Sequence, residues 1–536
     1  MLGWEQWFWS DGVNESTLGK FPKLSELTLK NCPRLIGNLP SCLPSLKKLR
    51  IKKCQGVVLA LRAAPDLTSL ASLQLIEIYG LVSLQEELVQ ALVALEDLDL
   101  ECCNELTYLW QDGVDLDKLS SLKRLRIVEC EQLVSLVEGE ERILPCNLEV
   151  LTEEDCCNLG KPANGLSSLT SLRDLRIRAC RKLVCFSEGA GLPLSLKRLD
   201  ISNCDSLRSL PDGMMTVVND SDCNHCLLEA LSVTACPSLN WLPKGKLPKT
   251  LKYLNISCDN QESLPEGILQ RDARETSRSN LEHLILRSLS VTTFPTGEFP
   301  ISLKELAIFY CRIPSLPPLH FLFHLTELTI LGCNELKWFP KEGLPLPNLI
   351  SLVIDGCEKL RSLPTHMDSL KSLQHLRISK CHRLDSLPER GLPPNLTSLE
   401  IINCKISRPM SEWGLRMLTS LKRFSVESTI DVDRFPDDEG LLLPPSLTFL
   451  EISNQENLKS ISRGLQHLTS LEVLNIFKCP ILQFFPREGF PLSLGCIRIR
   501  SSPLLEERCL KEKGDPWSII AHIPIVDIVV QQDLKE

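Results

Sequence analysis

The segment LKKLRIKKC, residues 46–54, carries leucine, leucine, isoleucine and cysteine at its first, fourth, sixth and ninth positions. The same pattern, Leu-x-x-Leu-x-Ile-x-x-Cys, recurs as LKRLRIVEC at 122–130 and LQHLRISKC at 373–381. With conservative variants it occurs twenty times, at a mean period of about 24.7 residues. The first leucines of these copies are Leu24, Leu46, Leu73, Leu95, Leu122, Leu148, Leu172, Leu196, Leu228, Leu251, Leu281, Leu303, Leu325, Leu349, Leu373, Leu396, Leu421, Leu447, Leu471 and Leu494.

A period of 20–29 residues with this leucine spacing is the signature of a leucine-rich repeat. The second leucine and the isoleucine stand two apart, so they point to one face of a short strand. One such strand cannot bury its apolar face alone, and stacked repeats share a continuous core. We therefore expect an α/β-type repeat solenoid, a horseshoe with a parallel β-sheet on its concave face. Leu-Pro pairs in the returning segments disfavour regular helix, which predicts mostly irregular or 3-10 convex segments.

The position eight residues after the first leucine is usually cysteine, and the chain holds 24 cysteines in all. Free cysteine behaves as a small buried hydrophobe, so we interpret these residues as structural packing. Successive cysteines would lie about 5 Å apart, within the reach of a disulfide. Folding in an oxidising compartment would therefore risk wrong crosslinks, which favours a cytoplasmic location. A Cys-x-x-Cys pair with His225, in the segment 220–226, has half the ligands of a zinc site, and we interpret it as a polar loop.

Composition excludes several classes of protein. The chain is 43% hydrophobic and 24% charged, which is typical of a folded protein. A formal net charge of −9 argues against nucleic acid as a partner. No apolar run of 18 residues is present, so no membrane span is expected, and the N-terminal sequence has no signal-peptide pattern. No nucleophile elbow, metalloprotease motif or kinase motif set occurs, and we expect neither enzymatic activity nor a cofactor.

Three features resemble the leucine-rich-repeat region of plant intracellular disease-resistance proteins of the coiled-coil, nucleotide-binding type. They are the cysteine-ended repeats with Leu-Pro returns, the segments WEQW at 4–7 and NCPRL at 31–35, and the closing segment LLEERCLKEKGDPWSIIAHIPIVDI at 504–528. The resemblance implies a protein-recognition and autoinhibitory arm, whose partners are a pathogen effector, or a host protein that it modifies, and the receptor's nucleotide-binding module. The chain has no Gly-x-x-x-x-Gly-Lys-Ser/Thr phosphate loop, so we expect this chain to lack that module. The alternative is a general cytosolic interaction scaffold without a defence role.

We expect three regions: a Trp-rich lead-in and N-terminal edge at 1–23, the solenoid at 24–502, and a C-terminal cap and tail at 503–536. Solvent-facing strand positions are mostly charged in the first eleven repeats, where Lys48, Arg50 and Lys52 form a basic row that we assign to intramolecular docking. In the last nine repeats large apolar residues enter these positions, and we assign them to partner binding. They are Phe309, Leu331, Val353, Ile402, Phe449, Val473 and Phe477.

One repeat breaks the pattern of its neighbours. The sixth places Glu153 where the others have Ile, Leu or Val. Burying an unpaired carboxylate is costly, so the group either neutralises, finds a partner or stays hydrated. Stacked repeats interact only with their neighbours, and one poor interface can divide the cooperative unit. We therefore expect the sixth repeat to be a weak point.

Overall fold

We analysed a computed structural model of the chain. The structure describes residues 21–529 except 22, 36–42, 55–66, 140–143, 162–165, 187–191, 211–226, 240–246, 258–263, 265–267, 270–278, 291–296, 318, 389–390, 407, 430–431, 437–442 and 511–514. It divides into two compact units. Unit 1 comprises Met1–Asn260 with Pro265–Ile268, and unit 2 comprises Gln261–Leu264 with Leu269–Glu536.

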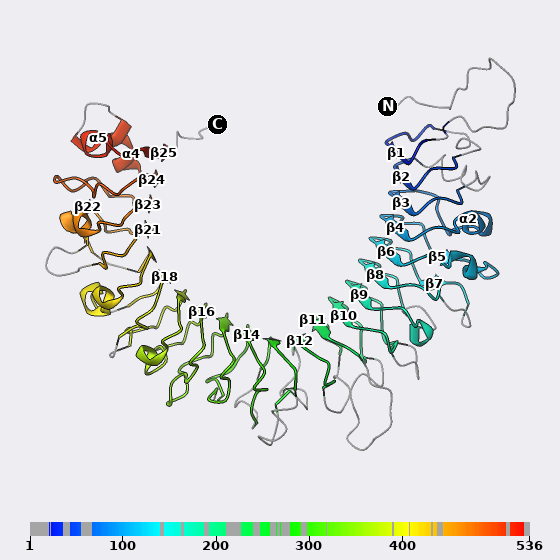
Figure 1. Cartoon of the computed structure of the whole chain (residues 1–536), viewed down its shortest axis with the longest axis horizontal. Coiled ribbons are helices and arrows are strands. Elements are labelled where there is room, and N and C mark those ends of the chain that lie inside the picture. The colour runs from blue at the N-terminus through cyan, green and yellow to red at the C-terminus, as the bar shows by residue number, and fades with distance from the viewer. Residues whose placement is uncertain are drawn as a thin grey trace, which may run out of the picture. The chain divides into compact units, whose positions relative to one another are not determined.

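Unit 1 is built on a parallel sheet in which each strand pairs with the corresponding strand of the next repeat. In Figure 1 these strands line the inner side of the unit's arc and the returning segments lie outside them. The strands, in order, are β1 (Glu26–Lys30), β2 (Lys48–Lys52), β3 (Ser72–Ile76), β4 (Asp97–Glu101), β6 (Arg124–Val128), β8 (Val150–Glu154), β9 (Asp174–Arg178), β10 (Arg198–Ser202), β11 (Ala230–Thr234) and β12 (Tyr253–Ser257).

Unit 2 repeats this plan with a second run of parallel strands. They are β13 (His283–Arg287), β14 (Glu305–Phe309), β15 (Glu327–Leu331), β16 (Ser351–Asp355), β17 (His375–Ser379), β18 (Ser398–Ile402), β19 (Arg423–Glu427), β21 (Phe449–Ser453), β23 (Val473–Phe477), β24 (Cys496–Arg500) and β25 (Ile525–Val529). The predicted fold class, a leucine-rich-repeat solenoid with a parallel sheet, is confirmed.

The returning segments are mostly irregular, as the Leu-Pro pairs predict. Their regular elements are short: the helix α2 (Glu86–Ala91), the 3-10 helices η1 (Leu116–Leu119), η2 (Leu166–Ser168), η3 (Met367–Ser369), η4 (Met410–Trp413), η5 (Leu415–Met417) and η6 (Arg463–His467), and the paired strands β5 (Tyr108–Trp110) with β7 (Ser135–Val137) and β20 (Arg434–Phe435) with β22 (Ser460–Ile461). After β24 the chain forms the helices α4 (Pro503–Leu510) and α5 (Asp515–Ile520) before it enters β25.

The sequence-based register of the third repeat is wrong by three residues. Leu73 pairs with Leu49, which is the second leucine of its repeat, so the third repeat begins at Leu70 rather than Leu73. Leu70 is fully buried, and Ile78 takes the place that cysteine holds elsewhere. The pattern is ambiguous here because leucine or isoleucine fills every required position in both registers.

Most strands of the two sheets are followed by a left-handed residue and then by the repeat cysteine. Residues such as Ala179 and Ala235 have positive φ there, and Gly332 and Gly356 take the same place in unit 2. The cysteine side chain that follows is buried in all fourteen predicted cases. It also donates hydrogen bonds to backbone oxygens: the Cys180 thiol lies 3.5 Å from the oxygen of Arg178 and 3.9 Å from that of Glu153 in the preceding strand.

These thiols are therefore hydrogen-bond donors as well as apolar packing, a role that the sequence interpretation missed. In some repeats without cysteine a polar side chain makes the same bonds, whereas Ile78 and Leu289 fill the position with an apolar side chain. Thr429 donates to the oxygens of Glu427 and Ile401, and Gln455 donates to those of Ser453 and Val426. In most repeats the position therefore selects a buried donor that satisfies the carbonyls at the strand end.

We expect mild thiol reagents to distinguish the cysteines sharply. All cysteines in the described residues are free, and Cys146 is the exposed one among them. Burial raises the pKa of Cys479 to about 11, and burial together with the carboxylate of Glu129 raises the pKa of half-exposed Cys102 to about 12. Because the thiolate is the reactive form, Cys146 should label first in native protein, and most of the 24 thiols only after denaturation. Mass spectrometry of labelled peptides tests this, and disulfides between successive repeat cysteines would contradict it.

Candidate functional site

The solvent-facing side of each sheet is made of alternate strand residues. In β2 the side chains of Lys48 and Arg50 are exposed and that of Lys52 is half-buried. Leu49 and Ile51, which alternate with them, are fully buried. The same alternation holds along both units, so the first, third and fifth residues of each strand form the concave surface. This surface holds all of the residues that the sequence analysis assigned to binding or docking.

In unit 1 the charged rows of neighbouring strands neutralise each other. Arg124 of β6 donates to Asp97 of β4 at 2.8 Å, and Arg126 donates to Asp99 at 2.9 Å. Exposed pairs of this kind contribute about 0–1 kcal/mol each, so they order the side chains more than they stabilise the fold. The acidic row of β4 is therefore not an isolated patch of one sign.

The predicted basic row of β2 is partly neutralised in the same way. The Nζ atom of Lys48 lies 2.8 Å from a Glu26 carboxylate oxygen, and that of Lys52 lies 2.9 Å from one of Glu77. Among the described residues, Arg50 has no ion-pair partner. The basic character of the row therefore rests chiefly on Arg50 and on Lys30, which lies opposite Lys52 in the sheet.

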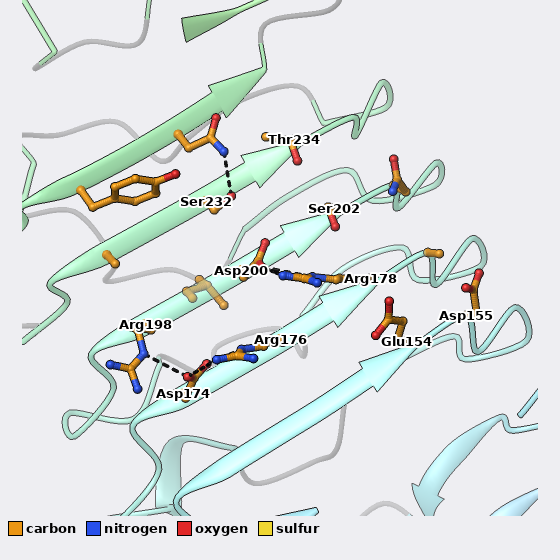
Figure 2. Close-up of a pocket in the computed structure, with 16 residues that line it drawn as sticks. Glu154, Asp155, Asp174, Arg176, Arg178, Arg198, Asp200, Ser202, Ser232 and Thr234 are labelled. Carbon is orange, nitrogen blue, oxygen red and sulfur yellow. Dashed lines mark hydrogen bonds and ion pairs between the residues drawn. The ribbon is translucent and has the colours of Figure 1, made fainter. Parts of the chain in front are cut away.

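A hollow of about 710 Å³ lies over β8–β12 of unit 1. At one end of it lies Asp174, whose side chain is only 3% exposed and accepts hydrogen bonds from two arginines: Arg176 on the same strand, at 2.8 Å, and Arg198 on β10, at 2.9 Å. Arg178 donates its Nε to Asp200 at 3.1 Å. Figure 2 shows the two clusters one after the other along the same pair of strands, β9 and β10.

The rest of the hollow is lined by polar side chains, which are carboxylates in one part and hydroxyls in another. Glu154 and Asp155 lie where β8 ends, and the hydroxyls of Ser202, Ser232 and Thr234 lie along the other strands (Figure 2). The carboxylates of Glu154 and Asp155 make no ion pair within 4.0 Å among the residues that the structure describes. The sequence analysis did not single out this hollow, although consecutive repeats with Asp and Arg at equal offsets signal cross-strand pairs.

Phe309, Leu331 and Val353, on successive strands, are predicted to form a first apolar group, and the structure places two of the three directly together. Phe309 of β14 lies opposite Leu331 of β15. Val353 lies opposite Thr329, and Asp355, two residues further along β16, lies opposite Leu331, so Val353 is only a diagonal neighbour of this group. Arg287 stacks on the ring of Phe309, with its Cζ 4.6 Å from the ring centre.

Tyr310 extends this apolar group beyond the strand end. It is 60% exposed, and its ring lies against Gly332, where an added Cβ would come within 2.4 Å of a ring carbon. A glycine with positive φ at 332 therefore makes room for an exposed aromatic ring. Sequence analysis missed Tyr310 because it occupies the turn position after the strand.

Phe449, Val473 and Phe477 are predicted to form a second apolar group, but the group in the structure is longer at one end and does not include Phe477. Phe449, Val473, Cys496 and Ile525 lie opposite one another on β21, β23, β24 and β25. Phe477 lies at the other end of β23, opposite Ser453 and Arg500. Ile402 lies apart from both groups, between Ser379 and Glu427.

Metal and membrane features are not found in the described part of the chain. No group of three His, Cys, Asp or Glu residues there is placed to hold a metal ion. The Cys-x-x-Cys segment at 220–226 lies outside the described residues, as does the WEQW stretch. Within the described residues, no helix combines the length and apolar character needed to cross a bilayer.

Comparison with known proteins identifies relatives in plants. A disease resistance protein of Arabidopsis thaliana is 35% identical over 346 residues, which cover 63% of this chain and 23% of that protein. A second, the Arabidopsis disease resistance RPP13-like protein 1, is 31% identical over 160 residues, covering 30% of this chain and 14% of that protein. The chain is a leucine-rich-repeat protein whose relatives are plant disease resistance proteins. The predicted resemblance is confirmed.

The chain spans less than a quarter of the length of either of these disease resistance relatives. No family model matches the sequence. Among solved structures, a leucine-rich-repeat protein of Leptospira interrogans is 18% identical, with 88% of this chain and 98% of that chain covered and a TM-score of 0.41. YopM of Yersinia enterocolitica is 21% identical, with 89% and 91% covered and a TM-score of 0.38.

Proposed function

We propose that this chain is the protein-recognition and autoinhibitory arm of a plant disease-resistance receptor and that it works in the cytoplasm without enzymatic activity. The observation that carries the proposal is the 35% identity to a disease resistance protein over 346 residues of the chain. An open, extended sheet face supports binding rather than catalysis, because it presents a long surface instead of a closed pocket. Its partners are a pathogen effector, or a host protein that the effector modifies, and the nucleotide-binding module of the receptor.

Partner recognition is assigned to the concave face of unit 2. Aromatic side chains are enriched among the residues that dominate binding energy at protein interfaces. Phe309 and Phe449 each lie beneath an arginine, with Arg423 Cζ 3.9 Å from the Phe449 ring centre. Such a pair offers a partner an apolar surface and a cation at the same place. Leu331, Val353, Ile402, Val473 and Phe477 complete the proposed partner surface.

Docking to the nucleotide-binding module is assigned to Lys48, Arg50 and Lys52. In a receptor that joins this chain to such a module, reversing all three to Glu should release the module and cause cell death without a pathogen. Arg50→Glu alone is the cleaner variant, because Lys48 and Lys52 would each face Glu26 or Glu77 after reversal.

The measurement is ion leakage from leaves that express the joined receptor. Arg383→Glu is the matched control and should stay silent, because Arg383 is an exposed turn residue of unit 2 that, like Arg50, makes no ion pair among the described residues. Silence of both Arg50→Glu and the triple reversal would contradict the docking assignment. The alternative, a scaffold without a defence role, predicts that no variant of the arm changes the response of any such receptor.

A further inference from the structure

The hollow over β8–β12 carries an inference that does not depend on the defence role. Its charges are not spread evenly. At the start of β9 and β10, two arginines share one carboxylate, because Arg176 and Arg198 both donate to Asp174. That end is left with an excess of positive charge.

The opposite end of the hollow has an excess of negative charge. Glu154 is the last residue of β8 and Asp155 follows it. Neither carboxylate makes an ion pair within 4.0 Å among the described residues, and the nearest guanidinium in register, that of Arg178, is bonded to Asp200. Two carboxylates at the rim of a hollow attract a cationic group.

The positive end is also held rigidly. Asp174 is almost fully buried, while the two arginines on it are 46% and 59% exposed. The carboxylate fixes the guanidinium groups in one arrangement, so a ligand would not have to order them. Each guanidinium group bound to Asp174 still has N–H groups that do not face Asp174, and these can donate hydrogen bonds to a carboxylate of a ligand.

Beside the two charged ends, on β10, β11 and β12, the hollow has a neutral polar wall. Ser232 accepts a hydrogen bond from the Asn255 amide at 3.3 Å, and the hydroxyls of Ser202 and Thr234 line the same wall. Such groups pair with a peptide backbone and do not discriminate between side chains. The wall therefore offers hydrogen bonds to the backbone of an extended segment that lies in the hollow and reaches both charged ends.

We infer that this hollow binds an extended segment of a partner protein that carries one acidic and one basic side chain. The acidic group sits at Arg176 and Arg198, and the basic group sits at Glu154 and Asp155. Arg198 and Glu154 are two strands apart and four residues apart along the strands, which corresponds to roughly 16 Å at sheet spacings. An extended chain covers that distance in about five residues.

Synthetic peptides test this directly with the full chain. The first probe is an end-blocked octapeptide of Ser, Thr and Val with Glu and Lys five positions apart; the second has Gln at both positions. Fluorescence anisotropy at 50 mM salt should show the charged peptide binding at least tenfold more tightly. Peptides with two Glu or two Lys should lose most of this advantage. Equal binding of the mixed-charge and neutral peptides would overturn the inference.

Protein variants locate the binding. Arg198→Gln with Glu154→Gln should abolish the preference for the charged peptide, while Arg126→Gln, a matched loss of a concave arginine on β6, should leave it unchanged. Ala230→Trp fills the hollow with bulk and keeps every ion pair, so it should weaken binding even if the charge variants prove unstable. An equal loss in Arg126→Gln, or unchanged binding in Ala230→Trp, would show that the peptide binds elsewhere by general charge attraction and would overturn the inference.

Discussion

Replacing Glu153 with isoleucine is expected to raise the free energy of unfolding by roughly 2–4 kcal/mol at pH 7. Glu153 is fully buried on β8, and neither carboxyl oxygen has a hydrogen-bond partner in the described residues. It lies between Ile127 and Ile177 in the sheet, so the substitution completes an isoleucine row. Chemical denaturation of the two proteins measures the difference, and hydrogen exchange at Val150–Glu154 tests whether the gain is local.

The pH dependence gives an independent check on Glu153. Burial raises its pKa from 4.5 to about 8. Between about pH 4.5 and 8 the carboxyl group of Glu153 is therefore protonated in the folded state and ionised in the unfolded state. The free energy of unfolding of the native protein accordingly falls as pH rises through this window. Glu153→Gln cannot ionise and should remove that dependence while keeping the shape of the side chain. Parallel stability curves for the native protein and Glu153→Gln from pH 5 to 8 would contradict this account.

Ending the chain at Ser502 is expected to give aggregated protein. This truncation removes α4, α5 and β25, which bring Leu505, Cys509, Ile520 and Ile523 into buried positions. It also removes β25, one of the two partner strands of β24, and so exposes the edge of β24, which can pair with another chain. We propose on this basis that the segment 503–536 is the cap of the solenoid.

A chain that ends at Val529 is the matched control, because it keeps both helices and β25. Size-exclusion chromatography with light scattering should show it as monomeric, in contrast to the chain that ends at Ser502. A soluble, monomeric Ser502 truncation with an unchanged melting temperature would rule out the cap. Not every apolar residue of this segment is packed, since Leu504 and Ile525 are exposed.

The repeat pattern predicted the strands because each buried position has a fixed place in a period of about 25 residues. Glu153 was recognisable in advance for the same reason, since it occupies a position that its neighbours fill with isoleucine. The third repeat was misplaced because Leu70, Leu73 and Ile76 satisfy two registers, and only the pairing of Leu73 with Leu49 selects one. β25 was missed as a strand because its sequence, IVDIV, lacks the leucines of the repeat.

The candidate site was less predictable because it depends on contacts between repeats. That Arg124 faces Asp97 follows from their equal offsets. That Arg176 turns back to Asp174 on its own strand, where it meets Arg198, depends on side-chain conformations that no spacing determines. Phe477 was grouped with Val473 although four residues separate them along β23.

The central claim is that the concave face of unit 2 recognises the partner. The most direct measurement is triggered cell death in leaves that express a receptor carrying this arm, together with the pathogen protein that it responds to. Phe309→Glu with Phe477→Glu should abolish the response without loss of protein, because both side chains are half-buried on the concave face and neither fills the core. The control pair Trp338→Glu with Met417→Glu changes exposed residues of the returning segments and should leave the response intact. An intact response in the phenylalanine pair together with a lost response in the control pair would contradict the claim.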